Sequence, residues 1–184
     1  MAFDTIITRS SALLAAMALL AGCASTNKLV SGPPTADQGK GYLGGIFTGW
    51  EDPIGKGPYY AFVFVEERSG EAYTLPFFDP ETQGREPHKF KLIEVPVGRY
   101  RFSHWYTYRM PFTEKLAESK QFPGVPSVIE VEPARVSYVG SFKTDERYAS
   151  VTESTYWIKP FPRQAAEVSG LLAAEHPGFA LSSK

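Results

Sequence analysis

Cys23 carries the most distinctive chemistry in the sequence, because it is the only cysteine of the chain. Its thiol is the one sulfur able to form a thioether. The residues before it are Leu20, Ala21 and Gly22, and small side chains at the last two positions allow the backbone to lie in a peptidase cleft. These residue types permit cleavage of the backbone beside Gly22 and reaction at the sulfur of Cys23.

An apolar segment, residues 12–21, leads into this cysteine, and a short lead containing Asp4 and Arg9 precedes the segment. The segment is shorter than the roughly 20 residues that a helix needs to cross a bilayer. Residues 1–22 are therefore predicted to be a cleaved signal peptide. The alternatives are a plain secretory signal followed by an incidental cysteine, and a buried helix.

In this context Leu20-Ala21-Gly22-Cys23 resembles the lipobox of bacterial lipoproteins. The resemblance implies that Cys23 becomes the first residue, with diacylglycerol on its sulfur and an acyl chain on its amine. Several acyl chains give stable anchoring, whereas a single chain binds membranes only weakly. Ala24 follows the cysteine where retention in the inner membrane typically uses aspartate. The resemblance thus implies an outer-membrane location facing the periplasm, if the cell has two membranes.

Composition limits what the remaining chain can do. Residues 23–184 have the size of one domain. The sequence has 19 basic and 20 acidic residues, so it offers no basic excess for binding nucleic acid. With Cys23 committed to lipid, no disulfide can form within the domain, and stability must come from packing.

The aromatic and turn-forming residues favour a β-rich fold. The sequence contains 13 Phe, 10 Tyr and 3 Trp, together with 16 Gly and 15 Pro, which suits short strands joined by tight turns. Residues 24–40 are small, polar or turn-forming, and are predicted to be a flexible tether after the lipidated cysteine. Residues 41–184 are predicted to form a single antiparallel β-sandwich, with a C-terminal α-helix at about 162–176 that packs on a sheet.

Strands are predicted where apolar residues alternate or run continuously, at 42–48, 59–65, 72–75, 90–95, 99–103, 128–131, 136–142 and 154–158. Alternation is clearest at 99–103, where Tyr100 and Phe102 share one face while Arg99 and Arg101 share the other. The proline-containing stretch at 110–126 is predicted to be a long surface excursion.

The segment from Leu92 to Tyr100, followed by residues 129–133 and 138–142, resembles small bacterial lipoproteins with a carboxypeptidase-regulatory-like or transthyretin-like β-sandwich. The resemblance spans about a third of the chain. It implies the fold and brings no catalytic residues with it.

No catalytic or metal-binding motif is found in the sequence. His88, His104 and His176 lack metal-ligand spacing. His104 is expected on the face of Tyr100 and Phe102, as a hydrogen-bonded core or rim residue rather than a ligand or base. Nucleophile elbows, zinc-protease helices and nucleotide-binding loops are missing. The acidic pairs, Glu51-Asp52 and Glu66-Glu67, are expected to be solvated surface.

One aromatic stretch is a candidate recognition surface, and its members are Arg101, Trp105, Tyr106, Tyr108 and Arg109. If strand alternation continues past residue 103, Trp105 points outward with both arginines near it. Trp, Tyr and Arg are favoured contacts for a glycan strand or a partner protein. Alternatively, a bulge returns Trp105 to the core, or Trp105 lies beneath the C-terminal helix. The same two interpretations apply to Trp50.

The sequence therefore predicts a lipid-anchored protein of the bacterial cell envelope, acting as a non-catalytic binding or scaffolding module. No catalytic residue, metal or cofactor is expected beyond the lipid on Cys23. The expected partners are membrane lipid, through Cys23, and an envelope protein or glycan, whereas nucleic acid is not expected. Two alternatives remain: an envelope enzyme acting on peptidoglycan or another glycan, and an accessory subunit of a secretion or assembly complex.

Overall fold

The computed structural model describes residues 29–35, 37–48, 59–77, 89–109, 114–119, 122–148 and 154–183. The predicted signal peptide, Cys23, Trp50, the Glu51-Asp52 pair and His88 lie outside the described residues.

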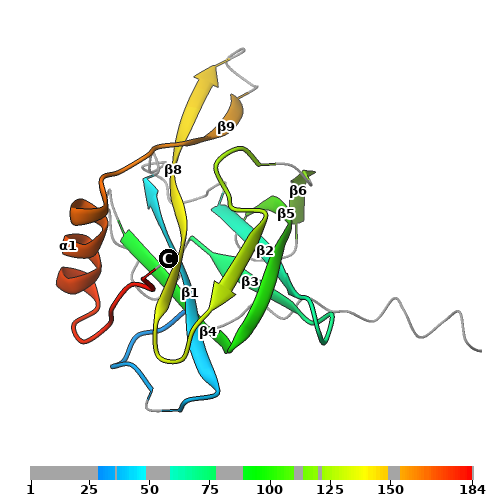
Figure 1. Ribbon diagram of the computed structural model, residues 1–184. Coiled ribbons are helices and arrows are strands. Elements are labelled where there is room, and N and C mark those ends of the chain that lie inside the picture. The colour runs from blue at the N-terminus through cyan, green and yellow to red at the C-terminus, as the bar shows by residue number, and fades with distance from the viewer. Residues whose placement is uncertain are drawn as a thin grey trace, which may run out of the picture.

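Two β-sheets and one helix make up the described fold (Figure 1). The four-stranded sheet has the order β4 (Lys89–Pro96), β1 (Lys40–Thr48), β8 (Val136–Tyr148) and β9 (Ser154–Pro160). The five-stranded sheet has the order β3 (Ala72–Pro76), β2 (Tyr59–Glu66), β5 (Gly98–Arg109) and β6 (Glu114–Ser119), and β7 (Val128–Val131) also pairs with β5. The helix α1 spans Ala165–Glu175. A mainly β fold with a C-terminal helix is confirmed.

The prediction of a purely antiparallel fold is wrong, because β1 and β8 are parallel neighbours. Tyr42 pairs with Val136 at one end of this contact, and Thr48 pairs with Lys143 at the other. Side-chain alternation shows which face of a strand is buried but carries no information about the direction of the neighbouring strand. The sequence pattern of β1 was therefore compatible with either direction.

The predicted excursion at 110–126 is also corrected, because it contains β6, which pairs antiparallel with β5. The sequence of β6, Glu114-Lys115-Leu116-Ala117-Glu118-Ser119, has no alternating apolar pattern. The pairing with β5 places it in a strand nevertheless, which illustrates how context overrides weak intrinsic β-propensity.

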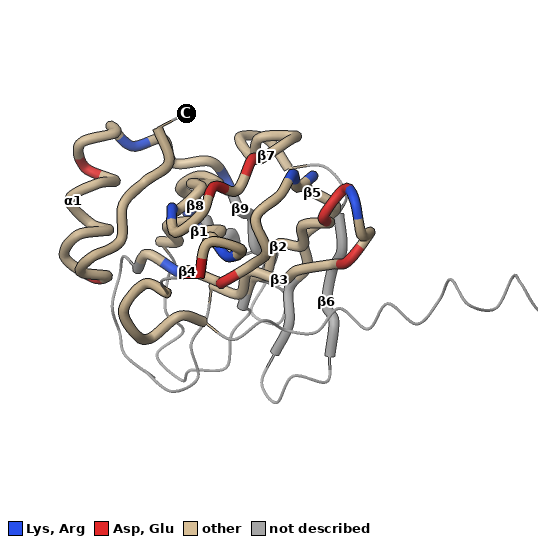
Figure 2. The backbone as a smooth tube through the Cα atoms, turned by 60° about the horizontal axis from the view of Figure 1, so that its bottom comes forward, with Lys and Arg blue, Asp and Glu red and all other residues tan. Residues whose placement is uncertain are grey.

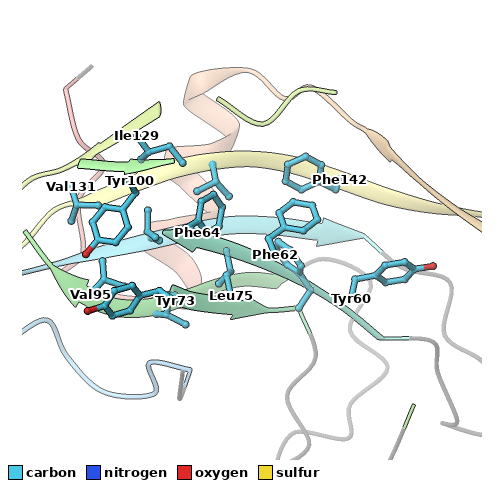
Figure 3. Packing of buried hydrophobic residues seen from close by; sticks show 14 residues of the cluster. Tyr60, Phe62, Phe64, Tyr73, Leu75, Val95, Tyr100, Ile129, Val131 and Phe142 are labelled. Atoms are coloured by element: carbon cyan, nitrogen blue, oxygen red, sulfur yellow. The ribbon is translucent and has the colours of Figure 1, made fainter. Parts of the chain in front are cut away.

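The main hydrophobic core lies between the two sheets (Figure 3). The four-stranded sheet contributes Leu43, Ile93, Val95, Val139 and Phe142. The five-stranded sheet contributes Tyr60, Phe62, Phe64, Tyr73, Leu75, Tyr100, Ile129 and Val131. Edge-to-face contacts fix the centre, where the ring of Phe62 lies 4.8 Å from Phe142 and 5.0 Å from Phe77 between centroids.

A second core forms where α1 covers the opposite face of the four-stranded sheet (Figure 1). Val168 and Leu172, one helical turn apart, are buried there. They pack with Tyr42, Ile46, Phe90, Leu92, Val136 and Phe179. The predicted packing of the helix on a sheet is confirmed. Among the described residues, no helix has the length and apolarity needed to cross a bilayer.

The chain contacts the domain well before β1, so the predicted tether to residue 40 is wrong for its described part. Leu29 forms an antiparallel bridge with Ile93 on β4, and Val30 donates its N–H to the carbonyl of Leu92 at 2.9 Å. Leu29 packs against the core between the sheets, while Val30 packs against the core beneath the helix. Two isolated apolar residues in a polar stretch are a weak sequence signal, and β4 supplies the hydrogen bonds that order them.

Candidate functional site

A bulge in β5 decides which side chains of the candidate recognition surface lie on each face. In the pairing with β2, His104 lies opposite Val63 and Phe102 lies opposite Phe64. Ser103 is therefore the extra residue on β5. An extra residue reverses the alternation beyond it, so residues 104 and 106 exchange faces with residue 105.

Trp105 consequently lies on the inner face, against the core between the sheets. Its ring centroid is 5.8 Å from that of Phe122 and 6.4 Å from that of Tyr60. Among the described residues, its buried indole N–H has no hydrogen-bond acceptor. The prediction that Trp105 points outward is wrong, and the alternative of a bulge that returns it to the core is confirmed.

His104 lies on the outer face, so its predicted place beside Tyr100 and Phe102 is also wrong. Its Nδ1 is 3.1 Å from Ser103 Oγ, and its ring centroid is 6.3 Å from that of Tyr106. The histidine is hydrogen-bonded, as expected. A serine and a histidine within hydrogen-bonding distance suggest a nucleophile and its base. Here the two are adjacent in sequence at a bulge, so local backbone geometry accounts for the contact.

The outer face of the five-stranded sheet therefore presents Arg101, His104 and Tyr106. Arg101 is exposed, whereas His104 and Tyr106 are half-buried. Val63, on the same face, is only 1% exposed, so the surface is not an open apolar platform. The backbone of Tyr108 and Arg109 continues β5, beyond a second irregularity between Thr107 and Tyr108, and their side chains lie outside the described residues.

Sequence reasoning missed His104 as a member of this surface. A signal for it exists, because Phe102 and Trp105 are three residues apart and two core-facing residues at that spacing do not fit strict alternation. A bulge between them satisfies both, and it places His104 and Tyr106 outward.

The pair Glu66-Glu67 is structural. Glu66 is buried, contrary to the predicted solvated surface, and its carboxylate accepts the backbone N–H groups of Arg68 and Ser69 at 3.0 and 2.6 Å. Hydrogen bonds from the Ser69 side chain and from these two backbone groups lower the pKa of Glu66. Glu67 pairs with Arg99, with 3.3 Å between Oε2 and Nε. Both carboxylates therefore stabilise the turn from β2 to β3 and its contact with β5.

Two buried tyrosines lie beside this turn. Tyr100 donates its hydroxyl to the carbonyl of Pro96, and Tyr73 donates to Glu71, both at 2.7 Å. Burial raises the pKa of Tyr100, and burial with the Glu71 contact raises the pKa of Tyr73 to about 12. Both phenols are therefore neutral hydrogen-bond donors at neutral pH, which suits a structural role rather than that of a proton acceptor.

Arg163 links α1 to the end of β1. Its side chain is 7% exposed and forms an ion pair with Glu167, one helical turn further on. Its Nη2 lies 3.4 Å from Thr48 Oγ1, and its guanidinium carbon lies 5.1 Å from the ring centroid of Phe161. Nζ of Lys143 is 4.9 Å from the same ring. The guanidinium group of Arg163 therefore makes these contacts within the protein.

The free edge of β4 is closed by two side chains from the end of α1. Glu175 Oε2 accepts the N–H of Phe90 at 2.8 Å, and Nε2 of His176 lies 2.7 Å from the carbonyl oxygen of the same residue. Leu29 and Val30 occupy the next part of that edge. No cluster of three or more metal-ligating side chains occurs among the described residues.

Comparison with known proteins does not assign the chain to a family. No family model matches the chain. No curated protein matches it. Among solved structures, a leucine-rich repeat protein from Bacteroides thetaiotaomicron aligns with 11% identity and a TM-score of 0.33. The alignment covers 61% of this chain but 14% of that protein.

Proposed function

We propose that the protein is a lipid-anchored component of the bacterial cell envelope, attached through Cys23 and acting as a non-catalytic binding or scaffolding module. The observation that carries the proposal is the position of Leu20-Ala21-Gly22-Cys23, which closes an N-terminal apolar run and contains the only cysteine. Cleavage before Cys23 leaves it as the first residue, with diacylglycerol on sulfur and an acyl chain on the amine. Ala24 favours the outer membrane, facing the periplasm.

The fold supports a display role. Two sheets with a shared core and a second core beneath α1 give a rigid body, which we take to be a β-sandwich extended by a helix. Three of its titratable side chains, Glu66, Tyr73 and Tyr100, satisfy hydrogen bonds of the fold. Arg163 likewise makes its contacts within the protein. Such groups stabilise a surface but do not converge on a reacting atom.

The recognition surface of this proposal is the outer face of β5, with Arg101, His104 and Tyr106. The exposed guanidinium of Arg101 offers hydrogen-bond donors beside two half-buried aromatic rings, which suits a glycan strand or a polar protein surface. Trp105 supports this face from within the core and takes no direct part in contacts.

Anchoring is tested by comparing the full-length protein with its Cys23→Ser variant in the native host. Wild-type protein is expected in the membrane fraction after high-salt washing, because acyl chains hold it independently of charge. The variant cannot carry the lipid and is expected to be lost from that fraction. Equal partitioning of the two proteins would refute lipid anchoring.

Binding is tested with purified peptidoglycan sacculi and, separately, by crosslinking in the envelope. A double substitution, Arg101→Ala with Tyr106→Ala, should reduce retention while leaving the melting temperature close to that of the wild type. Glu94→Ala, an exposed position on β4, serves as the matched control. Retention that is the same in all three proteins would exclude this face as the binding surface. A specific crosslinked protein instead of sacculi would favour an accessory subunit.

A further inference from the structure

The docking of Leu29 and Val30 on β4 fixes where the chain enters the domain. The bridge between Leu29 and Ile93 is antiparallel, so the backbone at Leu29 runs from the Pro96 end of β4 toward its Lys89 end. The first described residue, Leu29, is therefore directed with its N-terminal side toward the Pro96 end of β4. The antiparallel direction thus singles out one end of the molecule.

That end, here called the entry end, consists of the turn from β4 to β5 at Val97, the start of β1 at Lys40 and the turn from β7 to β8 at residues 132–135. Backbone hydrogen bonds join the three parts: Val97 donates to the carbonyl of Gly39 at 2.9 Å, and Ala134 donates to the carbonyl of Lys40 at 2.8 Å. Val97 is 38% exposed. Figure 2 brings this end forward.

Leu29 is the sixth residue after Cys23. Six residues span at most about 20 Å even when fully extended. A flexible tether reaching residue 40 would allow about 60 Å by the same measure. Docking on β4 therefore shortens the connection between a lipidated Cys23 and the folded domain about threefold.

We propose that this short connection holds the entry end toward the lipid bilayer and directs the opposite end away from it. The inference rests on the proposed lipidation of Cys23. The opposite end is the far part of β8 and β9, where Lys143 pairs with Lys159. Lys143 lies seven residues beyond Val136 on β8, which corresponds to about 23 Å along the strand.

Charge does not provide the orientation. The entry end carries Lys40 and Arg135 together with Glu132, and Figure 2 shows acidic and basic residues interspersed around it. A mixed surface has no strong attraction to anionic headgroups, and such attraction would be screened by salt. The preference is therefore set by chain length and should persist at high ionic strength.

Two labelled variants test the orientation: Val97→Cys at the entry end and Lys159→Cys at the far end, both exposed positions. A thioether at Cys23 does not react with maleimides, so each lipidated variant has one labelling site. The proteins are reconstituted in vesicles of phosphatidylcholine with an acceptor dye on a minority headgroup. Energy transfer to the headgroup dye is expected to be at least about twofold higher from a label at residue 97 than from one at residue 159, because the two positions lie at opposite ends of the strands.

Two further variants show whether the short connection is responsible. Inserting a ten-residue Gly-Ser segment between Ser25 and Thr26 should abolish the difference between the two label positions. Val30→Pro removes the N–H that bonds Leu92, and it should reduce the difference as well. Equal transfer from both positions in uninserted protein, or a difference that survives the insertion, would overturn the proposal. Intact mass of the same samples separates that result from failure of lipidation.

Discussion

Nε2 of His176 lies 2.7 Å from the carbonyl oxygen of Phe90. A carbonyl oxygen only accepts, so Nε2 carries the proton of this hydrogen bond. Glu175 accepts the N–H of the same residue, so consecutive side chains at the end of α1 satisfy both polar backbone groups of one edge-strand residue. At Phe90 this edge of β4 is therefore closed to pairing with a second chain.

This edge closure predicts the effect of changing Glu175. Glu175→Ala leaves the N–H of Phe90 without its acceptor and should lower the free energy of unfolding by about 1–3 kcal/mol. Glu175→Gln keeps an acceptor oxygen and should retain most of the stability. Urea unfolding followed by circular dichroism measures both. An alanine variant as stable as the glutamine variant would show that the contact is dispensable.

The inward position of Trp105 predicts a difference from its neighbour Tyr106. Trp105→Ala should cost about 2–4 kcal/mol, since it leaves a cavity against the core between the sheets. Trp105→Phe should cost less than about 1.5 kcal/mol, because the indole N–H has no acceptor among the described residues. Tyr106→Ala should cost about 1 kcal/mol or less. Urea unfolding with Tyr106→Ala as destabilising as Trp105→Ala would contradict the bulge at Ser103.

Alanine substitutions at two glycines are expected to change the stability of the protein in opposite directions. A methyl group at Gly41 would collide with the backbone carbonyl oxygen of Glu132, so Gly41→Ala should destabilise the protein by about 1–3 kcal/mol. Gly170 lies in α1, and apart from its chain neighbours and the backbone of the helix itself no atom lies within 4 Å of the place that an alanine methyl group would take. Gly170→Ala should therefore stabilise by about 0.5–1 kcal/mol. Thermal unfolding should give shifts of opposite sign. A stabilising Gly41→Ala would contradict the close packing of β1 against the turn after β7, and a destabilising Gly170→Ala would contradict the open space at that position of α1.

The raised pKa of Tyr73, about 12, predicts loss of stability at alkaline pH. An unfolded chain releases the phenol proton near pH 10, whereas the folded protein retains it, so ionisation favours unfolding. The stabilisation is complete below about pH 10 and is lost as the pH rises toward about 12. Urea unfolding at about pH 9 and about pH 11.5 should show this decline, and Tyr73→Phe should make it smaller. An identical decline in that variant would exclude Tyr73 as a contributor.

The local pattern of the sequence predicted the strands with the strongest apolar content. Continuous apolar residues marked β2, and alternation marked the start of β5. The parallel pairing of β1 with β8 could not be predicted from the sequence, because the two strands are distant along the chain and side-chain alternation does not depend on the direction of the neighbouring strand. The single residue Ser103 had the largest effect on the candidate site, since one inserted residue exchanges the faces of His104 and Trp105.

The edge of β4 shows the other limit of sequence reasoning. Leu29 and Val30 stand in a polar stretch whose composition is typical of a tether, and Glu175 and His176 end a helix whose apolar face was recognisable. The local sequence of neither segment indicates that it will bond to the unpaired backbone groups at the edge of β4. Non-local hydrogen bonds decide both positions.

Attachment through Cys23 is the central claim, and the mass of the intact protein tests it most directly. Protein extracted from membranes with detergent is measured by mass spectrometry as the intact chain and as its N-terminal peptide, and the Cys23→Ser variant is measured in the same way. The account predicts a chain that begins at Cys23 and carries diacylglycerol and an N-linked acyl chain. An unmodified chain that still begins at Met1 would contradict it.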